Sequence, residues 1–191
     1  MKEEPKKKLD LKKIILIGLG ALAGLIVVWA LGMWIYFLVT FKTYLNETDG
    51  VSISYPKTWT VKEHPAQDVF VVFLSPKDNA LDTFTENVNF STFDMSKQPH
   101  STADYAKIMV DQLLISFPDI SLVQKSPFPL AGQNGYRMVL EIAGDEPKMV
   151  VVYAFTIDTM GYNLLYIGSQ ERYSKDRLLL DAMALSLRVK Y

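Results

Sequence analysis

The sequence predicts an α+β protein in which a single N-terminal transmembrane helix precedes an antiparallel β-sheet with helices on both faces. Residues 14–41 carry no charged side chain, as expected of a helix that spans a membrane. Residues 69–74 and 149–157 are almost entirely apolar, which is typical of strands that are covered on both faces. Most connections between the predicted strands are short turns, and short turns join antiparallel neighbours.

The predicted transmembrane helix divides the chain into three parts. At a rise of about 1.5 Å per residue, residues 14–41 are long enough to cross a hydrocarbon core of about 30 Å. They follow a basic tail, residues 1–13, in which five lysines lie between positions 6 and 13. Because positively charged flanks remain on the cytoplasmic side, we expect a cytoplasmic N-terminus and an extracytoplasmic domain at residues 42–191. The expected location is the cell membrane, with a single pass.

Two short patterns inside this helix have alternative interpretations. Residues 21–23, Ala-Leu-Ala, are similar to a signal-peptidase site, but the apolar run continues well beyond them. We therefore favour an uncleaved anchor over a signal peptide. Gly20 and Gly24 have the G-x-x-x-G spacing that permits close helix–helix contact, although small residues are common in membrane helices in any case.

In the extracytoplasmic part, strand patterns surround two predicted helices. Ser101 is the expected N-cap of the first helix, with Asp104 in its first turn, and Pro118 ends it. The second helix is predicted to begin at Ser174. Its expected apolar face consists of Leu178, Leu179, Ala182, Met183 and Leu185. The expected strands are residues 43–46, 51–55, 59–61, 69–74, 87–93, 120–124, 136–142, 149–157, 162–169 and 187–191.

Glycine and proline pairs predict where several of these strands end. Asn134-Gly135 and Met160-Gly161 are typical turn sequences. Pro127 and Pro129 predict a corner after the strand at residues 120–124. The strand at residues 136–142 alternates apolar and polar side chains, so Arg137 and Glu141 are expected on its wetter face.

Composition excludes several classes of function. The formal net charge is −1, but the first 42 residues carry +4, which leaves −5 on the rest of the chain. A mildly acidic domain is a poor nucleic-acid binder, and we expect no nucleic-acid partner. The absence of cysteine excludes disulfides, thiol nucleophiles and thiolate zinc sites.

The two histidines are weak candidates for metal ligands. His64 lies in a predicted loop. His100 and Asp104 are spaced i, i+4 and could present one nitrogen and one oxygen ligand. Two ligands make a weak site, so no metal site is predicted.

Acidic and nucleophilic side chains give no firmer prediction. Asp78, Asp82 and Glu86 recur at every fourth position, which makes an oxygen-ligand calcium loop conceivable. The pattern lacks the EF-hand glycine and spacing, so we favour a solvated loop. No G-x-S-x-G motif is present. The sequence predicts no catalytic residue and no cofactor.

Residues 50–59, GVSISYPKTW, resemble the opening motif of the PsbP-like family, G-[FV]-S-hydrophobic-x-Y-P-x-x-W. The apolar strand ending in Ser-Pro at residues 71–76 is similar to the next family element. Residues 86–90 resemble an Asn- and Val-rich family strand, and residues 184–187 resemble the closing helix. The resemblance covers roughly residues 44–191. It implies an α/β/α sandwich around an antiparallel sheet, a fold shared with Mog-type Ran-binding proteins.

The resemblance also implies a class of function. The family is not known for enzymes, and its plant member is an extrinsic subunit of photosystem II. Our leading hypothesis is a membrane-anchored, extracytoplasmic, non-enzymatic accessory or interaction subunit of a membrane or envelope complex. Tyr55, Pro56 and Trp59 would then fill a core corner or form a contact surface. The alternatives are a ligand- or divalent-metal-binding module and, ranked last, a hydrolase with an unrecognised site.

Overall fold

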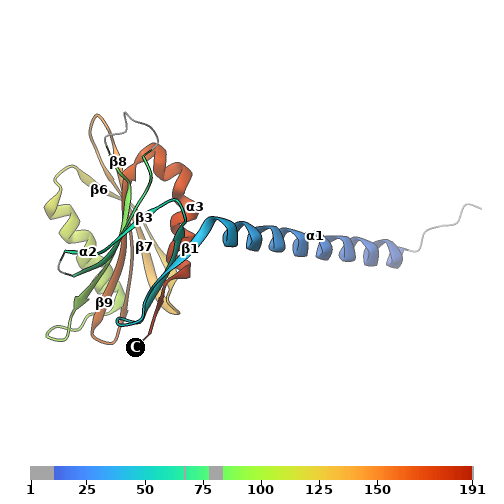
Figure 1. Cartoon of the computed structure of the whole chain (residues 1–191), viewed down its shortest axis with the longest axis horizontal. Coiled ribbons are helices and arrows are strands. Elements are labelled where there is room, and N and C mark those ends of the chain that lie inside the picture. The colour runs from blue at the N-terminus through green and yellow to red at the C-terminus, as the bar shows by residue number, and fades with distance from the viewer. Residues whose placement is uncertain (1–10, 67, 78–83, 191) are drawn as a thin grey trace, which may run out of the picture. The chain divides into compact units, whose positions relative to one another are not determined.

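The computed structural model describes residues 11–66, 68–77 and 84–190, which form two separate units. The first unit extends to Phe41 and consists of one helix, α1 (Leu11–Thr40) (Figure 1). Residues 15–40 of α1 are long and apolar enough to cross a membrane, although a signal sequence meets the same criteria. The helix begins three residues before the predicted span and ends one residue before its end, because Phe41 already belongs to a strand.

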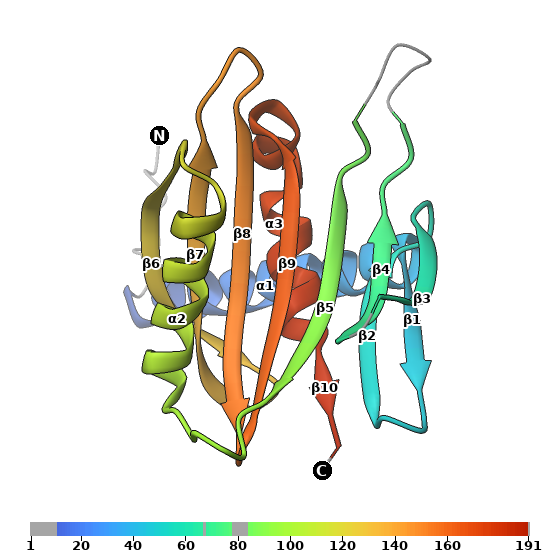
Figure 2. The same cartoon turned by 90° about the vertical axis from the view of Figure 1, so that its left-hand side faces the viewer.

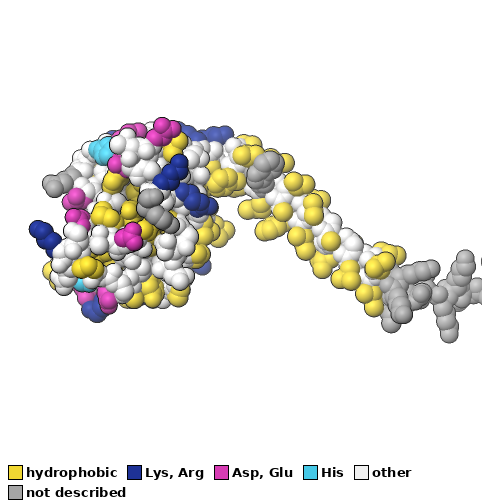
Figure 3. Space-filling view, turned by 90° about the horizontal axis from the view of Figure 1, so that it is seen from below, with side chains coloured by type: hydrophobic (Ala, Val, Ile, Leu, Met, Phe, Trp, Pro, Cys, Tyr) yellow, Lys and Arg dark blue, Asp and Glu magenta, His cyan; other side chains and the backbone are white. Residues whose placement is uncertain are grey.

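Most of the described hydrophobic side chains of α1 are exposed along the helix, as Figure 3 shows in yellow. Leu16 is 73% exposed and Val28 is 69% exposed. Near the end of α1 the Thr40 hydroxyl donates a hydrogen bond of 2.6 Å to the Tyr36 carbonyl. A helix with this much exposed aliphatic surface is expected to be stable in lipid rather than in water.

The second unit is built on a seven-stranded antiparallel sheet with the strand order β3-β4-β5-β9-β8-β7-β6. A three-stranded sheet has the order β1-β2-β10. Helices α2 and α3 lie on opposite faces of the large sheet (Figures 1 and 2). The predicted α+β class, with an antiparallel sheet between helices, is therefore confirmed. The elements are β1 (Phe41–Asn46), β2 (Val51–Pro56), β3 (Thr60–Ala66), β4 (Val69–Leu74), β5 (Asn87–Asp94), α2 (Thr102–Ser116), β6 (Ile120–Leu130), β7 (Gln133–Ile142), β8 (Lys148–Ile157), β9 (Met160–Ser169), α3 (Gln170–Ser186) and β10 (Arg188–Val189).

Helix α2 begins and ends where the sequence predicts. The Ser101 hydroxyl accepts a hydrogen bond from the Asp104 amide (3.2 Å) and donates one to the Asp104 carboxylate (2.6 Å). The helix ends at Ser116, two residues before Pro118. Its buried face packs on one face of the sheet, which we call the α2 face. The core there consists of Met95, Tyr105, Ala106, Met109, Val110, Ile120, Met138, Leu140, Val150, Val152 and Ala154.

Helix α3 begins earlier than predicted. Ser169, the last residue of β9, is its N-cap and accepts a hydrogen bond of 3.2 Å from the Arg172 amide. Ser174 lies inside the helix, where its hydroxyl donates to the Gln170 carbonyl (3.0 Å). The strand therefore passes directly into the helix, and the cap residue belongs to the strand pattern rather than to a loop.

The apolar face predicted for α3 is also partly wrong. Leu178 is 80% exposed and Leu185 is 49% exposed. The buried residues are Leu180, Met183 and Ala184, which pack against the other face of the sheet, the α3 face. Leucine content alone did not indicate the inward side, because the inward side of α3 also carries ionic side chains.

Strand β6 continues through the two prolines that were predicted to form a corner. Pro127 pairs with Tyr136 and Pro129 pairs with Asn134 in the antiparallel register. β6 lies at the edge of the sheet, where a residue without an N–H group removes no ladder hydrogen bond. The edge position therefore explains why both prolines are tolerated within the strand.

The turns predicted at Asn134-Gly135 and Met160-Gly161 are formed by other residues. Ala131 and Gly132, with φ of 49° and 79°, form the turn between β6 and β7. Gly135 lies inside β7, where an added Cβ would be 2.6 Å from Leu130 Cδ1 and 2.9 Å from the Ala154 carbonyl oxygen. Asn134-Gly135 is therefore not a turn, and its glycine permits close packing instead.

The hairpin between β8 and β9 turns at Asp158 and Thr159 rather than at Met160-Gly161. Asp158 adopts a φ of 50°. An added Cβ at Gly161 would lie 2.7 Å from ring atoms of Tyr105. This glycine lets α2 approach the sheet.

The two strands predicted to be covered on both faces differ. Nearly all of β8 is buried. In β4, Val71 and Phe73 are fully buried, whereas the alternate residues are half-buried. The small sheet covers the buried side of β4, since the Tyr55 ring lies 4.7 Å and the Tyr44 ring 6.0 Å from the Phe73 ring.

Candidate functional site

The motif residues Tyr55, Pro56 and Trp59 lie at the end of β2 and in the turn that follows it. All three are buried, and Tyr55 and Trp59 are only 7% and 4% exposed. The Trp59 amide donates a hydrogen bond of 3.0 Å to the Pro56 carbonyl, which closes the turn. Their positions fit a role in packing, and contact with a partner stays a prediction.

Gly20 and Gly24 lie in α1. A Cβ added to either would meet no neighbouring atom within 4 Å. The space that a second helix needs is therefore open, but association through these residues stays a prediction.

The histidines and acidic residues do not form a metal site within the described ranges, where no group of three or more such side chains could hold an ion. His64 is exposed in β3 rather than in a loop, and its ring lies 5.8 Å from that of Phe70. The Asp104 carboxylate accepts a hydrogen bond from the Ser101 hydroxyl in the cap of α2. This interaction is separate from the metal-ligand role that was considered for Asp104 together with His100.

The proposed acidic loop can be followed only in part. Asp78 and Asp82 lie outside the described residues. Glu86 is 5% exposed and accepts a hydrogen bond of 2.9 Å from the Ser75 hydroxyl. Glu86 is therefore a buried group that ties the ends of this segment together, and not part of a solvated loop.

An ionic cluster lies between α3 and the sheet. Arg137 of β7 is 6% exposed, and its Nε atom lies 3.3 Å from Asp181 of α3. Its Nη2 donates to the Tyr173 hydroxyl (2.7 Å), and the Tyr153 hydroxyl donates to the Asp181 carboxylate (2.6 Å). Burial, together with the bond to Asp181, raises the pKa of Tyr153. The prediction that Arg137 faces water is wrong, because α3 covers that face and supplies its counter-ion.

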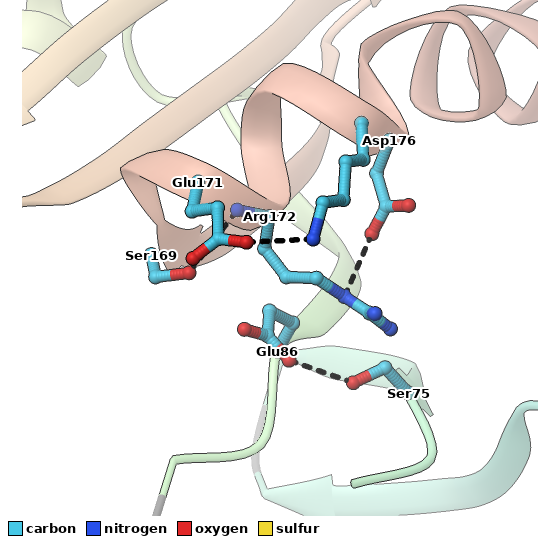
Figure 4. A network of polar contacts seen from close by, with 7 residues as sticks. Ser75, Glu86, Ser169, Glu171, Arg172 and Asp176 are labelled. Atoms are coloured by element: carbon cyan, nitrogen blue, oxygen red, sulfur yellow. Dashed lines mark hydrogen bonds and ion pairs between the residues drawn. The ribbon is translucent and has the colours of Figure 1, made fainter. Parts of the chain in front are cut away.

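A second polar group lies near the start of α3 (Figure 4). Arg172 extends from the helix toward Asp176, with 3.4 Å between Nε and the carboxylate, while Glu86 bonds Ser75 below them. Elsewhere on α3, Lys175 and Glu171 form an exposed ion pair of 2.7 Å.

Tyr166 lies beside this group on β9 and is 1% exposed. Its hydroxyl has no hydrogen-bond partner among the described residues. Burial raises the pKa of Tyr166, and the charges of Asp176 and Glu86 raise it further. An added Cβ at Gly168 would lie 2.0 Å from the Tyr166 hydroxyl and 2.7 Å from Glu86 Cγ. The absence of a side chain at Gly168 provides the room that this cluster occupies.

A pocket of about 220 Å³ opens at the start of α2, and we call it the α2 pocket. Met95, Tyr105, Ile108 and Met109 line its apolar interior, and the 41% exposed ring of Phe93 forms a wall. Burial raises the pKa of Tyr105 to about 12, while the bond that its hydroxyl accepts from Asn163 (3.2 Å) has a smaller lowering effect.

The edge of the α2 pocket is polar. Lys97, His100 and Gln112 lie there with Asp94, whose carboxylate accepts a hydrogen bond of 2.8 Å from the Ser96 amide. That bond lowers the pKa of Asp94. His100 thus belongs to a pocket wall, which its position before a predicted helix did not indicate.

The largest concentration of exposed apolar side chains in the second unit lies where α2 ends and β6 begins. We call this surface the α2–β6 patch. Ile115 lies in the last turn of α2 and is 82% exposed, whereas the inner side of that helix is buried. Its members are Leu114, Ile115, Phe117, Leu122 and Val123. β6 is an edge strand with a register irregularity between Leu122 and Gln124, so the patch adjoins the open edge of the seven-stranded sheet.

Sequence reasoning missed the ionic cluster, the α2 pocket and the α2–β6 patch. Arg137 and Asp181 are far apart in the chain, and no local pattern connects them. The patch had a weak signal, since Leu114 and Ile115 lie off the apolar face of the predicted helix.

Comparison with solved structures identifies the fold of the second unit. Cyanobacterial PsbP (CyanoP) from Synechocystis sp. PCC 6803 aligns with a TM-score of 0.57 and 17% identity, over 79% of this chain and 93% of that chain. The domain has a PsbP/Mog1-like fold. The resemblance noted in residues 50–59 is thus confirmed at the level of fold.

Two further structures have the PsbP/Mog1-like fold. LpqN, involved in cell envelope biogenesis of Mycobacterium tuberculosis, aligns with a TM-score of 0.58 and 8% identity, over 79% of this chain and 91% of that one. The Saccharomyces cerevisiae Ran-binding protein Mog1p aligns with a TM-score of 0.56 and 8% identity, over 78% and 95%. No protein-family model and no curated protein matches the sequence. At these identities the likeness shows the fold alone.

Proposed function

We propose that this chain is a single-pass membrane protein that presents its PsbP/Mog1-like domain outside the cytoplasm as a non-enzymatic accessory or interaction subunit of a membrane or envelope complex. One observation carries the interaction role. The α2–β6 patch exposes five large apolar side chains together at an open sheet edge. Exposed apolar side chains that gather in one region are favoured at protein–protein contacts.

The helix α1 supports the membrane part of the proposal. The described part of α1 exposes apolar side chains and contains no charged residue between positions 15 and 40. The lysines before it favour a cytoplasmic N-terminus. Removal of α1 as a signal peptide is the competing possibility.

The likeness to other proteins supports an interaction role in general terms only. Mog1p is a Ran-binding protein, and LpqN is involved in cell envelope biogenesis. We take from Mog1p a precedent for partner binding on this fold, and not a partner.

Topology can be tested with single cysteines, because the chain has none of its own. Lys125→Cys, on the exposed part of β6, should react with a membrane-impermeant maleimide on intact cells. Lys6→Cys, in the basic tail, should react only after permeabilisation. Reaction of Lys6→Cys on intact cells, or a mature chain that lacks the tail, would contradict the proposed topology.

The interaction role can be tested by copurification in a mild detergent. The double variant Ile115→Ser/Val123→Ser should lose a stoichiometric partner that the unmodified chain retains. Leu178→Ser is the matched control, because Leu178 is as exposed as Ile115 but lies on α3. An unmodified chain that purifies alone under every solubilisation condition would refute the proposal.

A ligand-binding role is the second candidate, and the α2 pocket is the observation that favours it. The pocket includes His100 but only one carboxylate, that of Asp94. Its chemistry therefore suits an organic ligand better than a divalent metal ion.

A further inference from the structure

The α2 pocket has walls whose backbone is fixed by the rest of the fold. The Met95 amide donates a hydrogen bond of 2.8 Å to the Thr159 carbonyl in the turn between β8 and β9. The Gln98 amide donates one of 3.0 Å back to the Met95 carbonyl. The hydroxyls of Thr102 and Thr156 lie 2.6 Å apart and connect the start of α2 to β8. Since these bonds hold both sides, the pocket exists without a ligand, which lowers the entropic cost of binding.

The interior of the α2 pocket suits one apolar group of limited size. Its volume is about 220 Å³. A dry cavity of about 150 Å³ accepts benzene in a well-studied protein, so this pocket has room for one ring and a short chain. Met95 and Met109 have flexible, polarizable side chains that adapt to the shape of a ligand and contact aromatic rings favourably. Phe93 offers a further exposed ring face for stacking.

The polar edge of the α2 pocket offers hydrogen-bond donors that the protein does not use. The side chains of Lys97, His100 and Gln112 form no hydrogen bond or ion pair with any of the described residues, although the charge of Lys97 helps to lower the pKa of the nearby Asp94. Asp94, the one acidic side chain at this edge, already accepts the Ser96 amide. The groups without a hydrogen-bond partner are therefore an ammonium, an imidazole and a carboxamide, each of which can donate a hydrogen bond to an anionic acceptor.

We propose that the α2 pocket binds a small molecule that joins an apolar body of about one ring to a carboxylate. The ring lies between Met95, Met109 and Phe93, and the carboxylate meets Lys97 and His100 at the pocket edge. This ligand site is separate from the α2–β6 patch, so it stands independently of the proposed interaction role.

Methionine methyl groups provide a direct readout in the full chain. The protein contains eight methionines, and two of them, Met95 and Met109, line the pocket. The chain would be labelled with ¹³C at the methionine methyl groups, solubilised in detergent and titrated with 3-phenylpropionate. The Met95 and Met109 signals should shift in a saturable way, whereas those of Met149 and Met183, on the α3 face, should not move.

Two further ligands of similar shape distinguish the contribution of the carboxylate to binding from that of the ring. The neutral 3-phenylpropionamide should bind more weakly than the acid, and 3-phenylpropylamine should bind most weakly, because its ammonium meets Lys97. Absence of a saturable Met95 or Met109 shift with all three probes would overturn the proposal. Equal or tighter binding of the amine than of the acid would overturn its carboxylate part. Parallel shifts of Met149 and Met183 would overturn the assignment of binding to the α2 pocket.

A single substitution tests the proposed contact between Lys97 and the ligand carboxylate. Lys97→Gln should raise the Kd for 3-phenylpropionate about three- to fivefold, the range expected of a partly exposed ion pair, and leave the Kd for the amide unchanged. Lys107→Gln is the control, because Lys107 lies on the outer side of α2 and pairs with Asp111. An unchanged Kd for the acid in Lys97→Gln, or an equal rise in Lys107→Gln, would contradict the assignment.

Discussion

The two faces of the seven-stranded sheet are covered in different ways. On the α2 face, the core between helix and sheet is made of aliphatic, methionine and aromatic side chains, and it opens into a pocket. On the α3 face, the helix also brings ionic and hydroxyl groups inward, where Arg137, Asp181, Tyr153 and Tyr173 bond one another. Exposed apolar side chains gather beside α2, whereas those on α3 are single residues such as Leu178.

This difference suggests a division of roles between the faces. A buried ionic cluster requires its partners in fixed positions, because an unpaired buried charge is costly. The α3 face is therefore expected to tolerate little change. The α2 face depends on non-directional apolar packing, which accommodates small shifts and leaves surface available for binding. Substitutions of similar kind on the two faces should give unequal effects.

The largest effect is expected from breaking the ionic cluster. Arg137→Met leaves the Asp181 carboxylate without its buried counter-ion and should lower the free energy of unfolding by about 3 kcal/mol. Urea unfolding of the detergent-solubilised chain measures this change. The double variant Arg137→Met/Asp181→Leu should recover most of the loss. A loss below about 1 kcal/mol in the single variant would show that the cluster contributes little.

A somewhat smaller effect is expected at the two glycines of β9, one on each face. Gly168→Ala places a methyl group 2.0 Å from the Tyr166 hydroxyl on the α3 face and should cost about 2–3 kcal/mol. Gly161→Ala meets the Tyr105 ring at 2.7 Å, but that ring borders the α2 pocket and can move, so about 1 kcal/mol is expected. The same unfolding measurement ranks the two variants, and the reverse order would contradict the comparison.

Alkaline pH should destabilise the domain through its buried tyrosines. The folded-state pKa of Tyr105 is raised to about 12, so its contribution is complete below the unfolded-state pKa of about 10 and is lost as pH rises toward 12. The loss from this residue should be about 2 kcal/mol across that window. Tyr105→Phe should flatten the dependence of unfolding free energy on pH above 10. A slope identical to that of the unmodified chain would show that Tyr105 is not the group involved.

Removing the Tyr166 hydroxyl should have little effect. Its oxygen is buried without a partner among the described residues, so Tyr166→Phe leaves no donor or acceptor unsatisfied. The free energy of unfolding should change by less than about 0.5 kcal/mol or increase. A loss above about 1 kcal/mol in the unfolding measurement would indicate a hydrogen bond that stabilises the folded state.

Local signals in the sequence were sufficient where structure depends on neighbouring residues. The Ser101–Asp104 cap, the ends of α2, and the apolar strands at residues 69–74 and 149–157 all follow from short patterns. The fold class then follows, because two apolar strands require cover on both faces. The motif at residues 50–59 indicated the same fold by resemblance.

The errors arise where distant contacts outweigh a local pattern. Asn134-Gly135 has a turn sequence, yet Gly135 is required where Leu130 and the Ala154 carbonyl crowd the strand. The alternating pattern predicts that Arg137 faces solvent, but in the folded domain α3 covers this residue. Pockets and patches also combine residues from separate elements, so neither the α2 pocket nor the α2–β6 patch could be assembled from sequence alone.

Photocrosslinking at two matched positions tests the central claim that this domain meets a partner through its α2 side. A photoreactive amino acid would replace Ile115 or Leu178 in the full chain in cells, since the two side chains are 82% and 80% exposed but lie on α2 and α3. We expect a discrete crosslinked product from position 115 that Phe117→Ser abolishes, and none from position 178. A product from position 178 alone, or from neither position, would contradict the account.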